Sequence, residues 1–506
     1  MTSHEAQAES GPPVALEYAS ARGKWVLTAT VLGSGLAMLD GTVVNVALPR
    51  IGEDLGGGLT ALQWTLNAYT LTLSGLLLLG GSLGDRMGRR RVYIIGVIWF
   101  TLASVGCAAA PSTGLLIAMR ALQGAGAALL TPGSLAILQA SFRREDRSAA
   151  VGAWSGLGGV ATALGPIIGG LLVGVAPWGW RLVFVINLPI AVVVVVLARR
   201  YVPESRDEQA TGRLDVPGAV LASAGLGGVI YGLTEGPATG WTQVTIAITA
   251  AGAVMLALFL LVESRTAEPL LPLGLFRERQ FTAANLVTFA VYAALAGALF
   301  LLPVQLQLVA GFSPVEAGAA TLPITVMMLL LSARMGKLSA RIGPRLPMTV
   351  GPIVAGLAMV WLSRVDAGAT YLGAVLGPML LFGLGLSTTV APLTSTVLAA
   401  APDHQAGVAS AINNDVARVA GLIAVAVLPA LAGLNPAAYA DPAMMSAGFH
   451  RAVLIAGAVC ASGGLLALVT IRDPSRAPAR EEAHDHADPA LSCAACPVLA
   501  PHIKPR

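Results

Sequence analysis

The stretch GSLGDRMGRR, residues 81–90, ends an apolar run and recurs in altered form as GKLSARIGPR, residues 336–345. The two copies agree at the first glycine, the leucine, one arginine, the second glycine and the last arginine. Glycine turns with arginines also recur in unrelated short basic loops, but here the glycine spacing and the arginine spacing match together. The pair therefore predicts a chain built from two repeated halves, as many secondary transporters are.

The composition around these loops is typical of a polytopic membrane protein. Of 506 residues, 55% are hydrophobic and 11% are charged, and the mean hydropathy is +0.74. No cleavable signal pattern precedes the first apolar run, so the first membrane helix is expected to direct insertion. The net charge of +4 is explained by cytoplasmic loops beside anionic membrane lipid, and it gives no indication of nucleic acid binding.

Fourteen runs are long enough to cross a bilayer, for which a helix needs about 20 apolar residues. They lie at 25–47, 62–83, 92–110, 113–138, 150–175, 181–199, 216–235, 241–262, 281–304, 315–335, 346–363, 370–398, 404–431 and 450–471. The sequence therefore predicts an all-α polytopic membrane protein with 14 transmembrane helices.

The basic residues orient these helices. With the N-terminus inside, all but six of the 31 lysines and arginines fall in the tails, in cytoplasmic loops or at cytoplasmic helix ends, as the positive-inside rule requires. The six exceptions are Arg50, Arg120, Arg181, Arg364, Arg418 and Arg451. We therefore expect a multi-pass protein of the bacterial cytoplasmic membrane with both termini in the cytoplasm.

The spacing of the two loops predicts the domain organisation. Eight helices separate the copies, two more than a six-helix half requires. We expect an N-terminal tail at 1–24, a six-helix bundle at 25–199, a linker at 200–280 that holds inserted helices seven and eight, a second six-helix bundle at 281–471, and a disordered cytoplasmic tail at 472–506.

The first loop resembles the signature that follows the second helix in the major facilitator superfamily, G-x-L-x-D-R-x-G-R-[RK]. It is matched without a gap by Gly81, Leu83, Asp85, Arg86, Gly88, Arg89 and Arg90. The resemblance implies that the loop is a conformational latch, whose acid and arginines exchange contacts as the two halves rock. The second copy has Ala340 in place of Asp85, so an acid that can pair with an arginine or a helix N-terminus is expected in the first half alone.

Two further motifs resemble those of the same superfamily. LLIAMRALQGAGAAL (115–129) places Arg120 within the membrane, with Gln123 and Gly124 one turn away. GLGGVATALGPIIGG (156–170) resembles the helix-five motif of its exporters, a small-residue face with a proline kink that allows close helix packing. The residues of this face are Gly156, Gly165, Pro166, Gly169 and Gly170.

The chain as a whole is most similar to the EmrB/QacA-type drug:proton antiporter family. The likeness rests on the fourteen helices, on LDGTVVNVALP (39–49) in the first helix and on WRLVFVINLP (180–189) in the sixth. It extends from about Trp25 to Ile471. It implies the major facilitator fold but specifies no substrate.

Asp40 is a lone acid inside the first apolar run. An acid at membrane depth costs roughly 2.5–3.5 kcal/mol on insertion scales, so it should face the protein interior. Counted from Trp25, it lies ~23 Å along the helix, beyond the midplane toward the outer face. Burial favours the protonated form of a carboxyl group and an approaching cation favours the charged form. Asp40 is therefore expected to carry the coupled proton; the alternative is a structural cap or hydrogen bond near the outer boundary.

Arg120 is open to two interpretations of equal weight. It tunes the protonation of Asp40 or contacts substrate, or it serves as a hydrogen-bond hub for helix-end carbonyls. Asp415 and Arg418 lie three residues apart on one helix face, which favours a local ion pair. The neighbouring Asn413 and Asn414 satisfy helix contacts or line the cavity.

Three polar side chains near the outer ends of helices complete the candidates. Gln305 and Gln307 follow Pro303 in helix nine, and they either line an outer vestibule or form interhelical hydrogen bonds. Glu235 is expected to be solvated at the rim of helix seven.

Metal and nucleotide cofactors are not predicted. The tail holds His484, His486, Cys493, Cys496 and His502, but a single CxxC with irregular histidines is a weak metal signal. No GxxxxGK[ST] phosphate loop occurs, so transport is expected to draw on a proton gradient rather than on ATP.

The function that these features predict is proton-coupled export of amphipathic or cationic drugs by alternating access. An exporter of a specific metabolite or lipid is the alternative within the same fold, and a non-transporting receptor or scaffold is the alternative from another class. No enzymatic cluster of nucleophile, base or metal converges at one depth. The expected partners are a small-molecule substrate, protons and membrane lipid. No periplasmic domain is large enough to suggest an adaptor, and the protein is expected to be a monomer.

Overall fold

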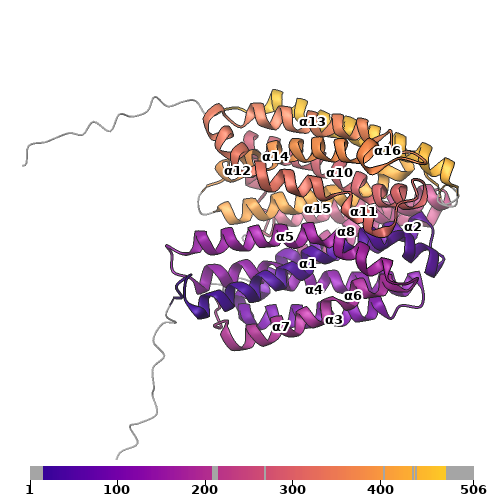
Figure 1. The fold of residues 1–506 in the computed structure, drawn as a ribbon. Helices are drawn as coiled ribbons and strands as arrows, with labels where there is room; N and C mark the ends of the chain where they lie inside the picture. The colour runs from indigo at the N-terminus through magenta and orange to yellow at the C-terminus, as the bar shows by residue number, and fades with distance from the viewer. Residues whose placement is uncertain are drawn as a thin grey trace, which may run out of the picture.

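The computed structural model describes residues 15–207, 215–266, 269–402, 405–435, 438 and 441–473. Over these ranges the chain is helical apart from one isolated bridge between Leu16 and Phe142, and fourteen helical spans are long and apolar enough to cross a membrane. The predicted fold class is confirmed: two six-helix bundles lie side by side with a pair of inserted helices (Figure 1).

The bounds of the elements follow the order of the chain. The N-terminal bundle consists of α1 (Ala21–Leu55), α2 (Leu59–Met87), α3 (Arg89–Ala108), α4 (Thr113–Ser141), α5 (Arg147–Gly174), η1 (Gly179–Arg181), α6 (Leu182–Val185) and α7 (Asn187–Tyr201). The inserted pair is α8 (Val216–Thr239) and α9 (Gln243–Glu263), followed by η2 (Leu273–Arg277). The C-terminal bundle consists of α10 (Arg279–Leu308), α11 (Pro314–Ala319), α12 (Leu322–Ile342), α13 (Arg345–Leu362), η3 (Tyr371–Val375), α14 (Leu376–Ala399), α15 (Ala406–Leu431) and α16 (Pro442–Thr470).

Several helices depart from the predicted bounds because capping and proline, rather than apolar content, set where they begin. α1 begins at Ala21 because the side chain of Ser20 accepts a hydrogen bond from the backbone of Gly23. α16 begins eight residues earlier than predicted, where Asp441 caps it and Pro442 occupies its first position. The tenth span is divided into α11 and α12 just before Pro323, which has no backbone N–H to continue the helix.

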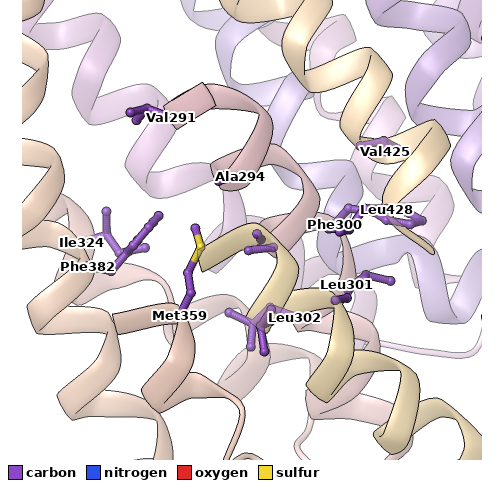
Figure 2. Packing of buried hydrophobic residues seen from close by; sticks show 14 of the residues in the cluster. Val291, Ala294, Phe300, Leu301, Leu302, Ile324, Met359, Phe382, Val425 and Leu428 are labelled. Carbon is purple, nitrogen blue, oxygen red and sulfur yellow. The ribbon is translucent and has the colours of Figure 1, made fainter. Parts of the chain in front are cut away.

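Both ends of the described chain lie at one end of the molecule, which we call the terminal end; the opposite end is the distal end (Figure 1). The buried apolar side chains show that the two bundles meet at the distal end. One cluster runs without a break from the distal half of α1 through α10 to α16, whereas the terminal half of the N-terminal bundle has a separate cluster of its own. Figure 2 shows part of the shared cluster, where Phe300 and Leu301 of α10 lie near Val425 and Leu428 of α15.

Hydrogen bonds and glycine contacts close the distal end further. Gln63 of α2 donates from Nε2 to the carbonyl of Val425 at 2.7 Å, and Gln307 of α10 donates to that of Val46 at 3.0 Å. Gln307 thus forms an interhelical hydrogen bond, one of its two predicted roles. Within the described residues, the hydrogen bonds between the bundles all lie in this distal half.

The helix-five motif supplies the closest approach of the two bundles. A Cβ at Gly170 would lie 2.5 Å from the carbonyl oxygen of Pro314, and a Cβ at Gly318 would lie 2.0 Å from that of Pro166. The small residues therefore let α5 and α11 touch backbone to backbone. Gly165 and Gly169 face the other way, against Thr42 and Val43 of α1. Gly156 has open space around it, so the predicted packing face does not extend to the start of the motif.

At the terminal end, the first loop is held by an acid from a distant segment. Gly88, at φ +106°, ends α2 and leaves α3 without a side-chain cap of its own. Glu204, three residues after α7, accepts a hydrogen bond from the backbone of Arg90 at 3.1 Å, and the Arg90 guanidinium donates to the carbonyl of Val202. The N-terminus of α3 thereby receives the negative charge that its dipole favours.

The second loop is built in the same way. Gly343, at φ +91°, ends α12, and Asp473, three residues after α16, accepts from the backbone of Arg345 at 3.0 Å. The Arg345 side chain donates to the carbonyl of Leu468. The prediction that an acid at a helix N-terminus is confined to the first half was wrong, because the acid comes from the end of each bundle's last helix rather than from the loop.

The inserted helix α8 contacts both bundles. Its Ile230 is buried against Leu422 and Ala426 of α15, and its Glu235 accepts a hydrogen bond from Trp64 Nε1 of α2 at 2.8 Å. Glu235 therefore forms a hydrogen bond to the N-terminal bundle. It is not simply solvated at the rim, which is what the sequence analysis predicted. The inserted pair lies beside the junction of the two bundles.

We expect Glu204→Ala and Asp473→Ala each to lower stability by about 1 kcal/mol, since each removes a helix N-terminal cap. Thermal unfolding of the purified protein in detergent should show a Tm lower by roughly 2–4 °C for each variant. Glu145→Ala, which alters an exposed acid in the α4–α5 connection, is the matched control. Because the two caps lie in separate bundles, their effects should add; an unchanged Tm in both single variants would contradict the capping role.

We expect Gly170→Ala to hold the distal ends apart, because the new methyl group would meet the Pro314 backbone, which cannot yield as a flexible side chain can. Spin labels at Trp178 and Ala367, in a background without other reactive cysteines, report the distance between the bundles. The distance distribution should shift to longer values in Gly170→Ala and stay unchanged in Gly156→Ala, a control in the same helix. Equal distributions in all three proteins would rule out this role for the α5–α11 contact.

Candidate functional site

Asp40 lies near the middle of α1, as the twentieth of its 35 residues. α1 begins four residues before Trp25 and continues to Leu55, whereas the position of Asp40 relative to the bilayer midplane stays a prediction. The side chain is fully buried and enters the interior of the N-terminal bundle. The lone acid of the first apolar run is thus at the centre of its helix.

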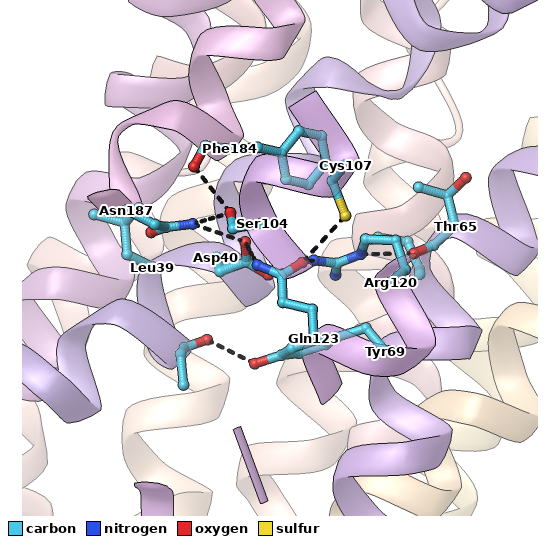
Figure 3. Close-up of polar contacts among 12 residues, drawn as sticks. Leu39, Asp40, Thr65, Tyr69, Ser104, Cys107, Arg120, Gln123, Phe184 and Asn187 are labelled. Carbon is cyan, nitrogen blue, oxygen red and sulfur yellow. Dashed lines mark hydrogen bonds and ion pairs between the residues drawn. The ribbon is translucent and has the colours of Figure 1, made fainter. Parts of the chain in front are cut away.

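Three side chains from other helices hold the Asp40 carboxylate (Figure 3). Arg120 Nη1 of α4 lies 2.5 Å from Oδ2, and Gln123 Nε2, one turn further along α4, donates to Oδ1 at 2.8 Å. Asn187 Nδ2 of α7 donates to the same Oδ1 at 3.3 Å. Both carboxylate oxygens therefore have partners, as a buried charge requires.

Arg120 is equally well satisfied. Its Nε donates to the carbonyl of Thr65 at 3.0 Å, and its Nη1 also donates to Gln123 Oε1 at 2.7 Å. The guanidinium lies over the ring of Tyr69, with its carbon 4.3 Å from the ring centre, a favourable cation–π arrangement. Arg120 thus joins α4 to α1 and α2, and the structure includes both an ion pair with Asp40 and a hydrogen bond to a backbone carbonyl.

A second layer of polar groups orients the amide of Asn187. Asn187 Nδ2 donates to Ser104 Oγ of α3 at 3.0 Å, and Ser104 donates to the carbonyl of Phe184 at 2.9 Å. The sequence analysis did not single out Ser104, Asn187, Thr65 or Tyr69 as site residues. A signal was present for Asn187, an amide inside the apolar run WRLVFVINLP, because a polar group at membrane depth needs a partner.

Removing both charges from water is costly, so the pair persists through its geometry and the surrounding hydrogen bonds. Five spans of the N-terminal bundle contribute to the network, and the fully buried Asp40 and Arg120 lie at its centre. A buried network of this kind is stable when every member is satisfied and weak when one partner is lost. The network therefore joins five spans of the N-terminal bundle at one buried centre.

A cavity of about 280 Å³ lies between the two bundles beside this network. Its walls come from α1, α2 and α4 on one side and from α10 and α15 on the other. Arg120 lines the cavity, whereas Asp40 does not. Arg120 therefore lies between the buried acid and the space that a ligand can occupy.

Asp415 and Arg418 of α15 do not form the predicted ion pair. No contact within 4.0 Å joins their charged groups, and Asp415 Oδ1 and Arg418 Nη1 are buried without a hydrogen-bond partner. Arg418 lines the cavity, Asp415 is not among the lining residues, and Asn414 is exposed. Asn413 satisfies helix contacts, since its Nδ2 donates to Asn285 and Thr288 of α10.

Gln305 lies away from the cavity and has a structural role. It is fully buried, and its Nε2 donates to the carbonyl of Val365 at 2.9 Å beyond α13. Its Nε2 also donates to Ser446 Oγ of α16 at 3.4 Å, so interhelical hydrogen bonding, the second of its two predicted roles, is the one observed. Ser446 of α16 lies nearby and donates to Asp366 at 2.8 Å; this hydrogen bond lowers the pKa of the Asp366 carboxyl group below its usual value.

The residues of the first loop are far from this cavity, at the terminal end. Asp85 pairs with Arg89 one turn later, at 2.8 Å between Oδ1 and Nη2, across the turn at Gly88. Gly81 packs against Pro132 of α4, and Arg86 lies in the last turn of α2, where a cation is favourable to the helix dipole.

No group of three or more histidine, cysteine or acidic side chains suited to a metal occurs among the residues that the structure describes. The histidines and cysteines of the tail, from His484 to His502, lie outside the described residues. That no metal is bound therefore remains a prediction.

The comparison with known families decides the identity of the fold. The family model for the Major Facilitator Superfamily matches residues 30–426. The chain belongs to the major facilitator superfamily. The resemblance drawn from the loop at 81–90 is thus confirmed, and the match runs from α1 through the inserted pair and ends within α15 of the C-terminal bundle.

Curated members of the superfamily resemble the chain over most of its length. A multidrug resistance protein of Mycobacterium tuberculosis is 37% identical over 79% of this chain and 74% of its own. A tetracenomycin C resistance and export protein of Streptomyces glaucescens is 36% identical over 80% and 75%. A puromycin resistance protein of Streptomyces alboniger is 37% identical over 82% and 83%.

Solved structures of the superfamily share the fold. A bacterial homologue of the human lysosomal transporter Spinster, in an inward-facing and occupied conformation, matches with a TM-score of 0.64 at 18% identity, over 89% of this chain and 98% of that one. A D-xylose–proton symporter matches with a TM-score of 0.63 at 17% identity, over 89% and 98%. At this identity the likeness concerns the fold alone.

We expect Asp40→Leu to destabilise this major facilitator protein by roughly 3–5 kcal/mol, because it leaves the buried Arg120 unpaired. The double variant Asp40→Leu/Arg120→Met removes both charges and should be closer to wild type than Asp40→Leu is. Chemical or thermal unfolding in detergent measures the stability of wild type, of Asp40→Leu and of the double variant. Losses that simply add in the double variant would contradict a coupled ion pair.

Proposed function

We propose that the protein is a proton-coupled exporter of amphipathic drugs or antibiotics, and that Asp40 and Arg120 couple the proton to the substrate. The observation that carries this proposal is the position of Arg120, which binds the buried Asp40 carboxylate and also lines the cavity between the bundles. One side chain thus contacts both the proton-binding group and the space for substrate.

The coupling follows from competition for charged groups. A proton that binds Asp40 removes its negative charge and releases Arg120 from the ion pair. A substrate held against the paired Arg120 favours the state in which Asp40 is ionised, so bound substrate disfavours proton binding and a bound proton disfavours substrate, as exchange of one for the other requires. Proton and substrate thereby influence each other through one arginine, which is the reciprocity that linkage between two sites requires.

Alternating access would use the two ends of the molecule in turn. In the described state the distal end is closed by the shared apolar cluster and by the α5–α11 contact. We place the terminal end in the cytoplasm, as the distribution of arginines suggests, so this state would face inward. The loop at 81–90, with Asp85, Arg86, Arg89 and Arg90, would act as the latch at the cytoplasmic end.

The direction and class of transport are supported by the relatives, whose names describe drug resistance and export. We place the protein in the bacterial cytoplasmic membrane, with the proton gradient as its energy source and no cofactor. The Asp40 network and both walls of the cavity come from a single chain, which supports a working monomer. The protein would carry its substrate without altering it chemically.

The test is proton movement in inside-out vesicles that contain the purified protein. After the interior has been acidified, addition of a transported drug should let protons leave, and a quenched pH dye should recover its fluorescence. Asp40→Asn keeps an acceptor oxygen for Arg120 but cannot bind and release the proton, so it should insert normally and show no recovery. Full recovery in Asp40→Asn would overturn the role of Asp40, and no drug-dependent recovery in wild type would overturn proton-coupled drug export.

A further inference from the structure

The cavity between the bundles has an unbalanced charge. Of the described residues that line it, two are charged and both are arginines, Arg120 and Arg418. The positive charge of Arg120 is neutralised by the buried Asp40 at 2.5 Å. Arg418 has no such partner: within the described residues it makes no ion pair, and its Nη1 is buried without a hydrogen bond. The Asp415 carboxyl group, one turn earlier in α15, interacts electrostatically with Arg418 without forming an ion pair, and it does not line the cavity. The charge that the cavity walls present to a ligand is therefore that of Arg418.

A second unsatisfied group faces the same cavity from the opposite bundle. Asn67 of α2 is 2% exposed, and its Nδ2 has no hydrogen-bond partner. Buried side-chain donors are rarely left unpaired, and leaving one so costs about 1–3 kcal/mol. The amide of Asn67 can either donate a hydrogen bond to a ligand or accept one from it. The guanidinium of Arg418 can only donate. A ligand group that contacts both side chains must therefore be a hydrogen-bond acceptor.

The remaining walls are largely apolar on the C-terminal side. Leu295 and Leu299 of α10 and Leu422 and Val425 of α15 line the cavity, together with the ring of Tyr292. These side chains offer an apolar surface for the body of a ligand. At about 280 Å³ the cavity lies near the lower end of the size range of small-molecule sites.

We propose that this cavity binds amphipathic acids, with an anionic group of the substrate held between Arg418 of α15 and Asn67 of α2. The class comprises apolar or aromatic bodies that carry a carboxylate, a sulfonate or an ionised phenol. The inference rests on the proposed export function and narrows it, since it replaces the expected cationic substrates with anionic ones. A cation would meet the charge of Arg418, which has no ion-pair partner, and find no lining carboxylate in the described cavity.

The arrangement also indicates how such a substrate would act on the protein. Asn67 belongs to the N-terminal bundle and Arg418 to the C-terminal bundle, so an anion bound by both joins the two halves. The same anion would lie beside Arg120, which also lines the cavity. The charge of the substrate, and not its shape alone, would then act on the Asp40–Arg120 pair.

The test is equilibrium binding of two xanthene dyes of similar shape and opposite charge to the purified full-length protein. Fluorescein is anionic at pH 7.5 and rhodamine 123 is cationic, and fluorescence polarisation gives the Kd of each without a proton gradient. We expect fluorescein to bind at least about tenfold more tightly than rhodamine 123, because one hydrogen-bonded charge contributes about that much or more. Equal or tighter binding of rhodamine 123, or no binding of fluorescein, would overturn the proposal.

Substitutions of Arg418 and Asn67 test whether fluorescein binds in this cavity. Arg418→Gln should raise the Kd for fluorescein about tenfold or more and leave rhodamine 123 unchanged or bound more tightly, while Arg418→Lys should retain the preference for the anion. Asn67→Asp should also raise the Kd for fluorescein. Arg451→Gln, which removes an exposed arginine of α16 outside the cavity, is the matched control. Fluorescein binding that is unaffected by Arg418→Gln in a protein with an unchanged elution profile would overturn the assignment.

An anionic lipid headgroup could supply the same chemistry, so a competition arm separates the two sources. Phosphatidylglycerol in mixed micelles should displace fluorescein no better than phosphatidylcholine does; selective displacement by phosphatidylglycerol would assign the site to lipid and overturn the small-acid proposal. The outcome is independent of the vesicle experiment. Failure of drug-dependent proton release would remove the export function, whereas a cationic preference here would leave that function standing and remove only the substrate class.

Discussion

The ion pair between Asp40 and Arg120 is the constraint on which the interior of the N-terminal bundle depends. Neither charge is tolerable alone at membrane depth, so α1 and α4 must keep the two groups in contact, and the amides of Gln123 and Asn187 must complete the shell. The small residues of α4, such as Gly124 against the backbone of Tyr69, then follow as a requirement, since helices that share buried polar groups must approach closely. A transporter can use such a pair because a proton and the arginine compete for the same carboxylate.

The two bundles have the same arrangement of helices but differ in how their buried charges are paired. The N-terminal bundle holds a closed network in which each charge has a partner, whereas α15 of the C-terminal bundle presents Arg418 to the cavity without one. The distal contacts between the bundles rely on apolar packing, two glutamine side chains and glycine. Contacts of this type can separate and re-form without leaving an isolated charge, which suits an interface that must open.

The sequence was sufficient to predict the number of helices, the repeat and the importance of Asp40, because apolar length and an isolated acid are local signals. It offered Arg120 as one candidate partner of Asp40 but could not predict Ser104 and Asn187, since these residues reach the site only through tertiary packing. The expected Asp415–Arg418 pair failed for a related reason: a spacing of three places two residues on one helix face but does not choose their rotamers. Helix ends were misplaced where Ser20 and Asp441 extend a helix by capping, a contribution that hydropathy does not measure.

The acids that follow the last helix of each bundle have a consequence for the history of the chain. Glu204 and Asp473 occupy equivalent places, and each ties the end of its own bundle to the loop between that bundle's second and third spans. Each half therefore contains, within its own sequence, the acid that joins the end of its last helix to the start of its third span. A unit of that kind could fold before it was joined to a copy of itself, so gene duplication and fusion needed to add only the connection, which here has grown into the inserted pair.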